Sequence, residues 1–386
     1  MAQRSNRGGF VRAGDLLGDA GKHAAPDVPV PPKQTHAESD VPKQPSRPEF
    51  ENAQLNLFQS FLGNSQEDRD RFSNAIDLWD SVPRYSVSRQ AMAKARTHGK
   101  FLGKNTATFQ HRQRTYSRTI QPAQVKDLDG EERFYYPSAT EELVEDALRK
   151  LAADQQAGFF DKPNYRSGVV FSLYALREEL KNRGHSRSYQ EIVLSLDILS
   201  GSIIEIVPLE PESGEGLLRS PYLPSLVAVS RTRLKDDPKA KWAVQFHPLV
   251  TGSIDEVTYR QYNYHLMMSH STQLARWLHK LLVLKYTFAD FTKPFETRFS
   301  TIKRDSGLLE SYARDRDGIQ ALEIAFRDLK ERDILLSFER RDITGPRKKI
   351  LDVVFQILPS LSFIAEAKAA NKRLSDAKQK ALGPRR

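Results

Sequence analysis

Residues 317–339 read DGIQALEIAFRDLKERDILLSFE and combine two hydrophobic patterns. Apolar residues first recur three or four positions apart, at Ile319, Leu322, Phe326 and Leu329. This spacing predicts an α-helix with one buried side and leaves the polar residues elsewhere on its surface. After Arg332 the period falls to two, at Ile334, Leu336 and Phe338, which predicts a strand directly after the helix.

A second apolar run, Ile350–Leu358, predicts another strand, so the two strands form a hairpin with a polar tip. The tip contains Gly345 and Pro346, which favour a turn, and a single acid, Asp342. Its cations are Arg340, Arg341, Arg347, Lys348 and Lys349. A helix followed by a hairpin with a basic tip is the last part of a winged helix. The pattern also fits any small α+β unit with a solvated basic loop.

The bulk composition is that of a globular protein with excess positive charge. The chain has 386 residues, of which 39% are hydrophobic and 28% charged, enough for two domains and tails. Its net charge of +10 and pI near 9.5 favour an anionic partner, nucleic acid before membrane. The absence of cysteine excludes disulfides and thiolate sites. No signal peptide and no apolar run of ~18 residues is present, so we expect a cytoplasmic protein without membrane contact.

The first part of the chain reads as a tail that carries a short peptide motif. Residues 1–49 contain seven of the 21 prolines and one aromatic residue, which predicts a disordered tail. Within residues 50–63, Gln54, Leu55, Leu57 and Phe58 have the form of a peptide that inserts apolar side chains into a groove. This pentapeptide resembles the motif by which many bacterial replication proteins bind the sliding clamp. The alternative is the first turn of an amphipathic helix that packs on the protein.

A basic run follows within residues 64–130, which we expect to form an arm and linker. From Arg84 to Arg118 there are nine Lys or Arg residues and no acid, interleaved with aromatic residues. A run of like charge repels itself unless an anion neutralises it, and DNA phosphates do so with release of counterions. The alternative is a flexible arm that is only solvated.

Two units with the same element order come next, which predicts an α+β protein with tandem winged-helix domains. Within residues 131–247, helices that begin near Ser138, Ser172 and Ser188 precede a strand at 203–207, a loop from Pro208 to Pro224 and a strand at 225–231. Within residues 248–358, two helical patterns precede the helix and hairpin described first. Residues 359–386 are expected to form a basic tail. Within them, Glu366–Arg386 carries seven basic and two acidic residues with no apolar stripe, which fits a frayed helix or a tail.

Catalytic motifs are missing from the sequence. There is no phosphate-binding Gly-x-x-x-x-Gly-Lys-Ser/Thr loop, no Gly-x-Ser-x-Gly elbow and no His-Glu-x-x-His helix. The nine histidines never occur as His-x-His, and His265, His270 and His279 fit packing or surface positions better than metal ligation. We therefore expect a protein that is not an enzyme and needs no cofactor or metal.

Taken together, the pentapeptide, the basic run and the two units resemble the TrfA-type replication initiators of bacterial plasmids, which bind iterons, short direct repeats in the origin. The resemblance covers about residues 50–340, and its most specific parts beyond the pentapeptide are Glu142–Leu148 and Phe326–Lys330. It implies that both winged helices bind double-stranded origin DNA, that the first also serves a homodimer, and that host replication proteins are recruited. The tail after Leu358 departs from the family.

The residues allow a finer prediction about the DNA surface. The third helix of the second unit and its approach offer Arg314, Arg316, Gln320, Arg327 and Lys330 for the major groove. The preceding short helix offers Arg298, Lys303 and Arg304 for phosphates, together with the hairpin cations. The first unit offers only Arg187 and Gln190, and its hairpin loop carries Glu210, Glu212 and Glu215 against Arg219. We therefore expect the second unit to supply most specific recognition.

Two hypotheses remain after this reading. The first is a plasmid replication initiator that binds iterons and recruits the sliding clamp through residues 54–58. The second is a winged-helix transcriptional regulator or partition adaptor that does not bind the clamp. An enzyme acting on DNA is the least favoured class.

Overall fold

The computed structural model describes residues 71–154, 158–161, 163–210, 216–228 and 241–382. The chain divides into two compact units, Met1–Pro45 and Ser46–Arg386, and every described residue belongs to the second. The predicted disordered tail and the clamp-binding residues Gln54, Leu55, Leu57 and Phe58 lie outside the described residues.

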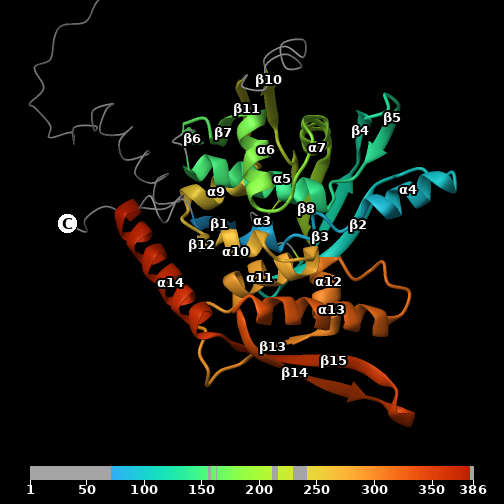
Figure 1. The fold of residues 1–386 in the computed structure, drawn as a ribbon, viewed down its shortest axis with the longest axis vertical. Helices are drawn as coiled ribbons and strands as arrows, with labels where there is room; N and C mark the ends of the chain where they lie inside the picture. The colour runs from blue at the N-terminus through green and yellow to red at the C-terminus, as the bar shows by residue number, and fades with distance from the viewer. Residues whose placement is uncertain (1–70, 155–157, 162, 211–215, 229–240, 383–386) are drawn as a thin grey trace, which may run out of the picture. The chain divides into compact units, whose positions relative to one another are not determined.

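The second winged-helix unit is orange to red in Figure 1. Its elements are α11 (Gln273–Lys285), β13 (Phe295–Arg298), α12 (Phe299–Ser306), α13 (Asp315–Glu331), β14 (Leu335–Thr344), η1 (Pro346–Lys348) and β15 (Ile350–Pro359). Strands β14 and β15 form a long antiparallel hairpin, and β13 pairs with the other side of β15. The predicted helices and hairpin are confirmed, and β13 is an additional strand.

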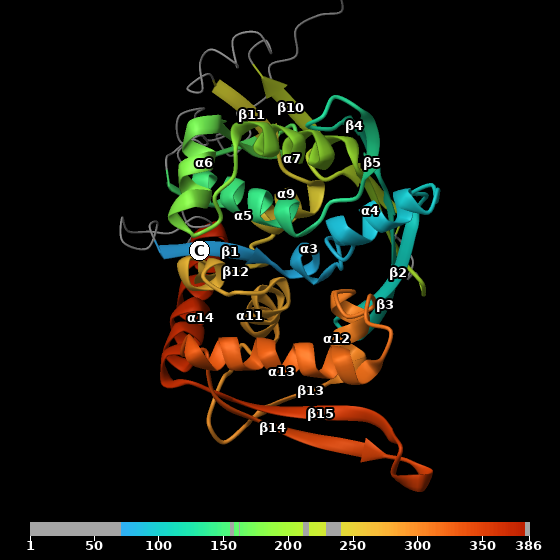
Figure 2. The same cartoon turned by 45° about the vertical axis from the view of Figure 1, so that its right-hand side comes forward.

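Helix α13 lies between α11 and the three-stranded sheet (Figures 1 and 2). Its predicted apolar residues are all buried. The ring of Phe326 lies 5.2 Å from that of Phe338 and 5.1 Å from that of Phe355, measured between centroids. The buried residues of α13 are thus covered by α11 and by the sheet, and the remaining side of the helix faces solvent.

The first winged-helix unit contains the three predicted helices. They are α5 (Ala139–Asp154), α6 (Leu173–Asn182) and α7 (Tyr189–Gly201). Ser172 caps α6 by accepting a hydrogen bond from the Ala175 N–H. Ser188 and Glu191 form the predicted capping box at the start of α7. At α5 the carboxylate of Glu141 accepts bonds from both the N–H and the hydroxyl of Ser138.

The strand pairing in the first unit differs from the prediction. Strand β8 (Ile203–Pro208) pairs with β9 (Leu218–Pro221), which lies inside the predicted loop. Strand β10 (Ser225–Ala228) instead joins β11 (Lys241–Gln245), β7 (Arg166–Ser172) and β6 (Gly158–Asp161) in a separate sheet. The prediction of a hairpin between 203–207 and 225–231 is therefore wrong. The short β9 buries only Ser220, so it has no apolar alternation by which the sequence could reveal it.

The segment expected to be an arm and linker is folded where the structure describes it. Its elements, with the flanking strand β5, are β1 (Phe72–Ile76), α3 (Asp77–Ser81), α4 (Arg89–Thr97), β2 (Asn105–His111), β3 (Arg114–Gln121), β4 (Ala123–Lys126) and β5 (Glu132–Tyr135). Strand β3 pairs with β8, which gives the sheet order β2-β3-β8-β9. The basic run is thus an integral part of the first unit, because its strands extend that unit's sheet.

The residues after the second unit form a packed helix where the sequence predicted a tail. Helix α14 (Leu361–Leu382) lies against β12 (Tyr259–Asn263), which follows α9 (Pro248–Asp255) and precedes α10 (Tyr264–Met268). Its buried side chains are two adjacent apolar residues at the start of the helix and three alanines further along: Phe363, Ile364, Ala367, Ala370 and Ala377. Alanines contribute most of this apolar side, so it was not evident in the sequence. Asn371 fixes the helix by accepting from Arg260 at 2.8 Å and donating to the Thr287 carbonyl at 2.8 Å.

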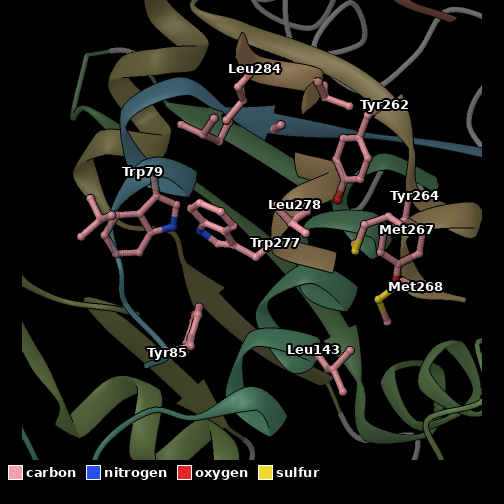
Figure 3. Close-up of a cluster of buried hydrophobic side chains, with 14 of the residues drawn as sticks. Trp79, Tyr85, Leu143, Tyr262, Tyr264, Met267, Met268, Trp277, Leu278 and Leu284 are labelled. Atoms are coloured by element: carbon pink, nitrogen blue, oxygen red, sulfur yellow. The ribbon is translucent and has the colours of Figure 1, made fainter. Parts of the chain in front are cut away.

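A continuous apolar core joins the two winged-helix units (Figure 3). Trp79 of α3, Leu143 of α5 and Trp277 of α11 all belong to it, so each unit and the short α3 helix contribute. Beside this core lies a group of buried charged side chains from the same three helices and from the segment that follows α3. They are Asp80, Arg84, Glu142, Glu145, Asp146, Arg149 and Lys280.

The buried charged side chains pair with one another. Arg84 donates to Glu145 at 2.5 Å and to Asp80 at 2.8 Å. Arg149 donates to Asp80 at 2.9 Å and to Asp146 at 2.6 Å. Lys280 of α11 lies 2.6 Å from Asp146, which links α11 to α5. Burial alone would raise the pKa of Asp80, but Arg149, Lys280 and Arg84 hold that pKa well below its usual range.

Replacing Lys280 by Met should lower the free energy of unfolding by about 3–5 kcal/mol, because Asp146 and Glu142 lose a buried cation. The matched control is Lys285→Met, which removes an exposed lysine from the end of the same helix. Urea denaturation of both variants measures the difference. Equal, small changes for the two variants would contradict the importance of the buried pair.

His247 is a buried histidine whose protonation should destabilise the fold at low pH. Its ring stacks on Trp79 at 4.0 Å, and its Nδ1 accepts the first N–H bond of α9 from Leu249. Burial, with a smaller effect from Arg84, lowers the pKa of His247 to about 3. Because an unfolded histidine has a pKa of about 6.5, the unfolded chain binds a proton that the folded chain excludes. Stability from this group is complete above pH ~6.5 and falls as the pH drops toward 3.

The variant His247→Asn should therefore flatten the pH dependence of stability, because asparagine keeps a cap acceptor and does not titrate. Between pH 7 and pH 4 we expect the wild type to lose on the order of 3 kcal/mol more than the variant. Denaturant unfolding at a series of pH values measures this. The control His98→Asn changes an exposed histidine and should leave the profile unchanged. Parallel profiles for wild type and His247→Asn would show that His247 does not govern acid sensitivity.

Candidate nucleic-acid interface

The exposed side of α13 carries a line of polar and basic side chains. Arg316, Gln320, Arg327 and Lys330 are all exposed, while the opposite side of the helix is buried. Their spacing of three, four and seven positions places them along one face. Of the predicted reading residues, these four therefore lie together as expected.

One acid, Glu323, lies within this line and is neutralised by neighbouring cations. Its carboxylate is 3.0 Å from Arg340 of β14 and 3.7 Å from Arg327. Arg340 also donates to Asp342, and these hydrogen bonds raise the pKa of its guanidinium. Arg340 therefore joins the hairpin to α13, and the face keeps a net positive charge.

The cations on the approach to α13 occupy surface ion pairs. Arg314 and Arg316 both lie near Asp317, at 3.1 and 3.3 Å. Lys303 of α12 pairs with Asp315 at 2.9 Å, and Arg304 pairs with its neighbour Asp305 at 2.7 Å. Exposed pairs of this kind contribute roughly 0–1 kcal/mol each, so a phosphate group can replace the carboxylate at small cost.

The cations of the hairpin divide between the two faces of the sheet. Arg340 points to the face covered by α13, since it contacts Glu323. Its neighbour Arg341 points to the other face because side chains alternate along a strand. Arg298 and Arg341 are both paired with Val354, on either side of it, so they share this outer face. The structure therefore does not place Arg298 and Arg341 beside the exposed line of α13.

At the tip, Arg347 and Lys349 are exposed on the turn between the strands. Arg347 has a φ of 59°, in the left-handed region, which lets the chain reverse within the short η1 turn. The main chain of Lys348 lies in the same turn, and its side chain is outside the described part of the chain. Arg347 and Lys349 thus give the tip positive charge, as predicted. The assignment of Arg340 and Arg341 to the tip is wrong, because both lie within β14.

Asp352 of the hairpin caps α12. Arg298, the first residue before α12, makes no capping side-chain bond. Instead Asp352 accepts from the Ser300 N–H at 3.1 Å and from the Ser300 hydroxyl at 2.6 Å. A carboxylate at this position satisfies a free N–H and is favoured by the helix dipole. The contact fixes the distal half of the hairpin to α12.

The corresponding surface of the first unit carries far less positive charge. Helix α7 contains no lysine or arginine, and Gln190 is its exposed residue near the start. Arg187 is half-buried before the helix, where its guanidinium donates to the Ser186 carbonyl at 2.7 Å. Glu210 is exposed after β8, while Glu212 and Glu215 lie outside the described residues. Exposed positive charge is therefore concentrated on α13 and not on α7.

Several of the nine cations of the basic run are bonded to acceptors within the protein. Arg84 is in the buried ion-pair group, and Arg89 pairs with Glu141 at 2.6 Å. Arg96 donates to the Phe134 carbonyl, and Arg118 is 2% exposed and donates to the Asn105 carbonyl and the Ser86 hydroxyl. Carboxylates neutralise Arg84 and Arg89, and neutral carbonyl and hydroxyl oxygens accept hydrogen bonds from Arg96 and Arg118, so these four side chains have acceptors inside the protein. Lys94, Lys100, Lys104 and Arg112 remain exposed.

Two apolar residues of the hairpin were overlooked in the sequence. Ile350 is 43% exposed and Leu351 is 63% exposed, beside the tip cations. The signal was available, because adjacent apolar residues at the start of Ile350–Leu358 break the strand alternation.

The histidines singled out in the sequence are placed separately. His270 and His279 are buried and share a 3.0 Å hydrogen bond between their rings, and His265 is exposed on α10. Burial lowers the pKa of both His270 and His279. Within the described ranges, no helix has the length and hydrophobicity needed to cross a membrane.

Comparisons with known proteins give only distant likenesses. No protein-family model and no curated protein matches this sequence. A crystal structure of selenomethionine derivatives of domains 2 and 3 of RctB is 11% identical, with a TM-score of 0.46, over 73% of this chain and 98% of that one. A second structure of RctB domains 2–3 has a TM-score of 0.41 at 11% identity, over 70% and 95% of the two chains.

A crystal structure of Pi initiator protein in complex with iteron DNA has a TM-score of 0.33 at 12% identity, over 57% of this chain and 90% of that one. Likenesses at these scores are too distant to decide the fold or the function of this chain. The fold described above therefore rests on the chain's own elements: an α+β protein in which two helical units each precede an antiparallel hairpin.

Proposed function

We propose that this chain is a plasmid replication initiator of the TrfA type that binds repeated origin DNA mainly through its second winged-helix unit. The exposed basic line on α13 is the observation that supports this most, because α7 offers no comparable charge. The resemblance of the sequence to TrfA-type initiators supports the choice of iterons as the target.

In this proposal α13 enters the major groove, whose width admits one helix. Arg327 and Gln320 lie near the middle of the exposed line, where they can reach base edges. Arginine pairs with two acceptors of guanine, and glutamine pairs with adenine in the same two-point manner. Lys303 and Arg304 of α12 then contact phosphates and fix the register of the helix, as do the tip cations Arg347 and Lys349.

The first unit and the segment before the fold supply protein contacts. Residues 54–58 dock on the sliding clamp, with Leu57 and Phe58 in its groove, and other host replication proteins are recruited to the origin. The first winged-helix unit serves a homodimer, as the family resemblance implies. The protein acts by binding, in the cytoplasm, and performs no reaction and needs no cofactor. The alternative is a transcriptional regulator or partition adaptor that uses the same DNA surface without clamp binding.

Footprinting on DNA that flanks the coding region should show evenly spaced protected sites about one or two helical turns apart. On a duplex carrying one protected site, Arg327→Ala should cost about 1–3 kcal/mol and relax sequence preference, because a base contact is lost. Lys349→Ala should weaken binding to all sequences and reduce the salt dependence, because a phosphate contact is lost. Fluorescence anisotropy at several salt concentrations measures both effects.

The control is Lys181→Ala, which removes an exposed cation from α6 of the first unit and should change neither property. Equal losses on specific and random duplexes for Arg327→Ala would show that α13 does not read the sequence. Absence of any protected repeat would count against an initiator.

A peptide spanning residues 50–63 should bind purified bacterial sliding clamp, because its leucine and phenylalanine side chains fill the groove. The double change Leu57→Ala and Phe58→Ala should abolish this binding. The matched control, Asn56→Ala, alters the position between the two apolar anchors and should retain most of it. Calorimetric titration measures the three peptides. Binding that survives the double change would favour the regulator hypothesis.

A further inference from the structure

The tip of the β14–β15 hairpin contains an irregularity that exposes an apolar side chain. Ile343 is paired with Asp352, and Thr344 is paired with Ile350, so Leu351 has no partner on β14. A single extra residue of this kind is a β-bulge, which twists the strand and redirects the side chain. Leu351 is 63% exposed, and Ile350 beside it is 43% exposed.

The turn is built to hold Leu351 in this position. A Cβ atom added to Gly345 would lie 2.9 Å from Leu351 Cδ1 and within 3.2 Å of two further carbons of the same side chain. Glycine at this position therefore lets the leucine side chain lie close over the turn. A hairpin tip in water normally carries polar and turn-forming residues, so two exposed aliphatic side chains need another explanation.

The apolar pair is surrounded by positive charge. Arg347 and Lys349 precede it on the turn, and Arg341 is exposed on the neighbouring strand. Asp342 is occupied by Arg340, at 2.6 Å, so it does not offset these cations. An aliphatic wedge flanked by cations matches the minor groove of DNA, where apolar side chains enter between base steps and cations contact the phosphates on both sides.

The hairpin also has a fixed position relative to α13. Arg340 joins it to Glu323, and Asp352 joins it to the start of α12. Ten residues of β14 extend roughly 30 Å, and the tip projects past the amino-terminal end of α13 in both views (Figures 1 and 2). This placement lets the tip reach DNA beyond the segment that α13 contacts.

We propose that Leu351, with Ile350, is a wedge that enters the minor groove next to the bound site, unstacks one base step and bends the DNA. This inference rests on the proposed binding of duplex DNA by α13. It goes beyond that function because it assigns the tip a deformation of the DNA in addition to phosphate contact. The bend is roughly 20–90°, toward the major groove, as for other apolar wedges.

The test uses the full chain and a duplex carrying one footprinted site with its flanking sequence. Donor and acceptor dyes at the duplex ends report bending, and 2-aminopurine at successive flanking steps reports unstacking. Wild type should raise 2-aminopurine fluorescence at one step and shorten the end-to-end distance. Leu351→Asn combined with Ile350→Thr should lose both signals while affinity changes by less than about tenfold, because the unstacking cost disappears with the wedge contacts.

Leu351→Met is the matched control, since it keeps an apolar side chain of similar size, and it should retain both signals. Both changed residues are exposed, and circular dichroism verifies that each variant is folded. Bending and fluorescence that are identical in wild type and the double variant, with binding intact, would overturn the wedge alone. Absence of binding by the wild type would overturn the proposed function and the wedge together.

Vesicles of anionic phosphatidylglycerol provide the last arm, because an apolar tip with cations also fits a lipid surface. The wedge proposal expects no vesicle binding that depends on Leu351. Vesicle binding that the double variant loses, without a change in DNA bending, would overturn the proposal in favour of a membrane contact.

Discussion

Lys280 of α11 donates to Asp146 of α5, and this buried contact holds the first helix of the second winged-helix unit against the first helix of the first unit. The contact is one part of a set in which Arg84 and Arg149 also pair with Asp80, Glu145 and Asp146. Removing a charge from water costs several kcal/mol unless a partner and hydrogen bonds compensate it. The three helices can therefore pack only in arrangements that match all these partners, which leaves the positions of α3, α5 and α11 little freedom.

This constraint matters for the candidate DNA surface because α13 packs directly on α11. Asp328 of α13 also accepts from the N–H and the hydroxyl of Ser271, just before α11. The basic line on α13 is thus built on a helix that is itself fixed to the first unit. The two units have a similar element order but different surfaces. The charged side chains of α5 are buried in ion pairs, whereas the basic side chains of α13 are exposed to solvent. The first unit therefore carries most of the buried charges of the junction, and the second carries the exposed basic line.

Residues that obey a local period were predictable, and residues whose partners are distant in sequence were not. The spacing of Ile319, Leu322, Phe326 and Leu329 identified the buried side of α13 without any knowledge of the sheet beneath it. The helix pattern of α5 gave no sign that Glu142 and Asp146 are buried, because their partner Lys280 lies more than a hundred positions away. In the sequence, β3 appears only as part of the basic run. The structure shows that it is a strand paired with β8. Pairing of this kind is set by tertiary contacts, which a single sequence does not display.

Two side-chain contacts orient the β14–β15 hairpin relative to the helices. Its strands and basic tip follow from alternation and turn residues, but its direction depends on Asp352 capping α12 and on Arg340 contacting Glu323. A hairpin without these contacts would be a solvated basic loop, the alternative that the sequence left open. Asp352 is the residue next to Leu351, so the cap of α12 and the close contact with Gly345 hold the bulge in place while the Leu351 side chain stays 63% exposed. Leu351 and its neighbour Ile350 form a small exposed apolar patch beside the tip cations, and this patch is the part of the hairpin to which the wedge is assigned.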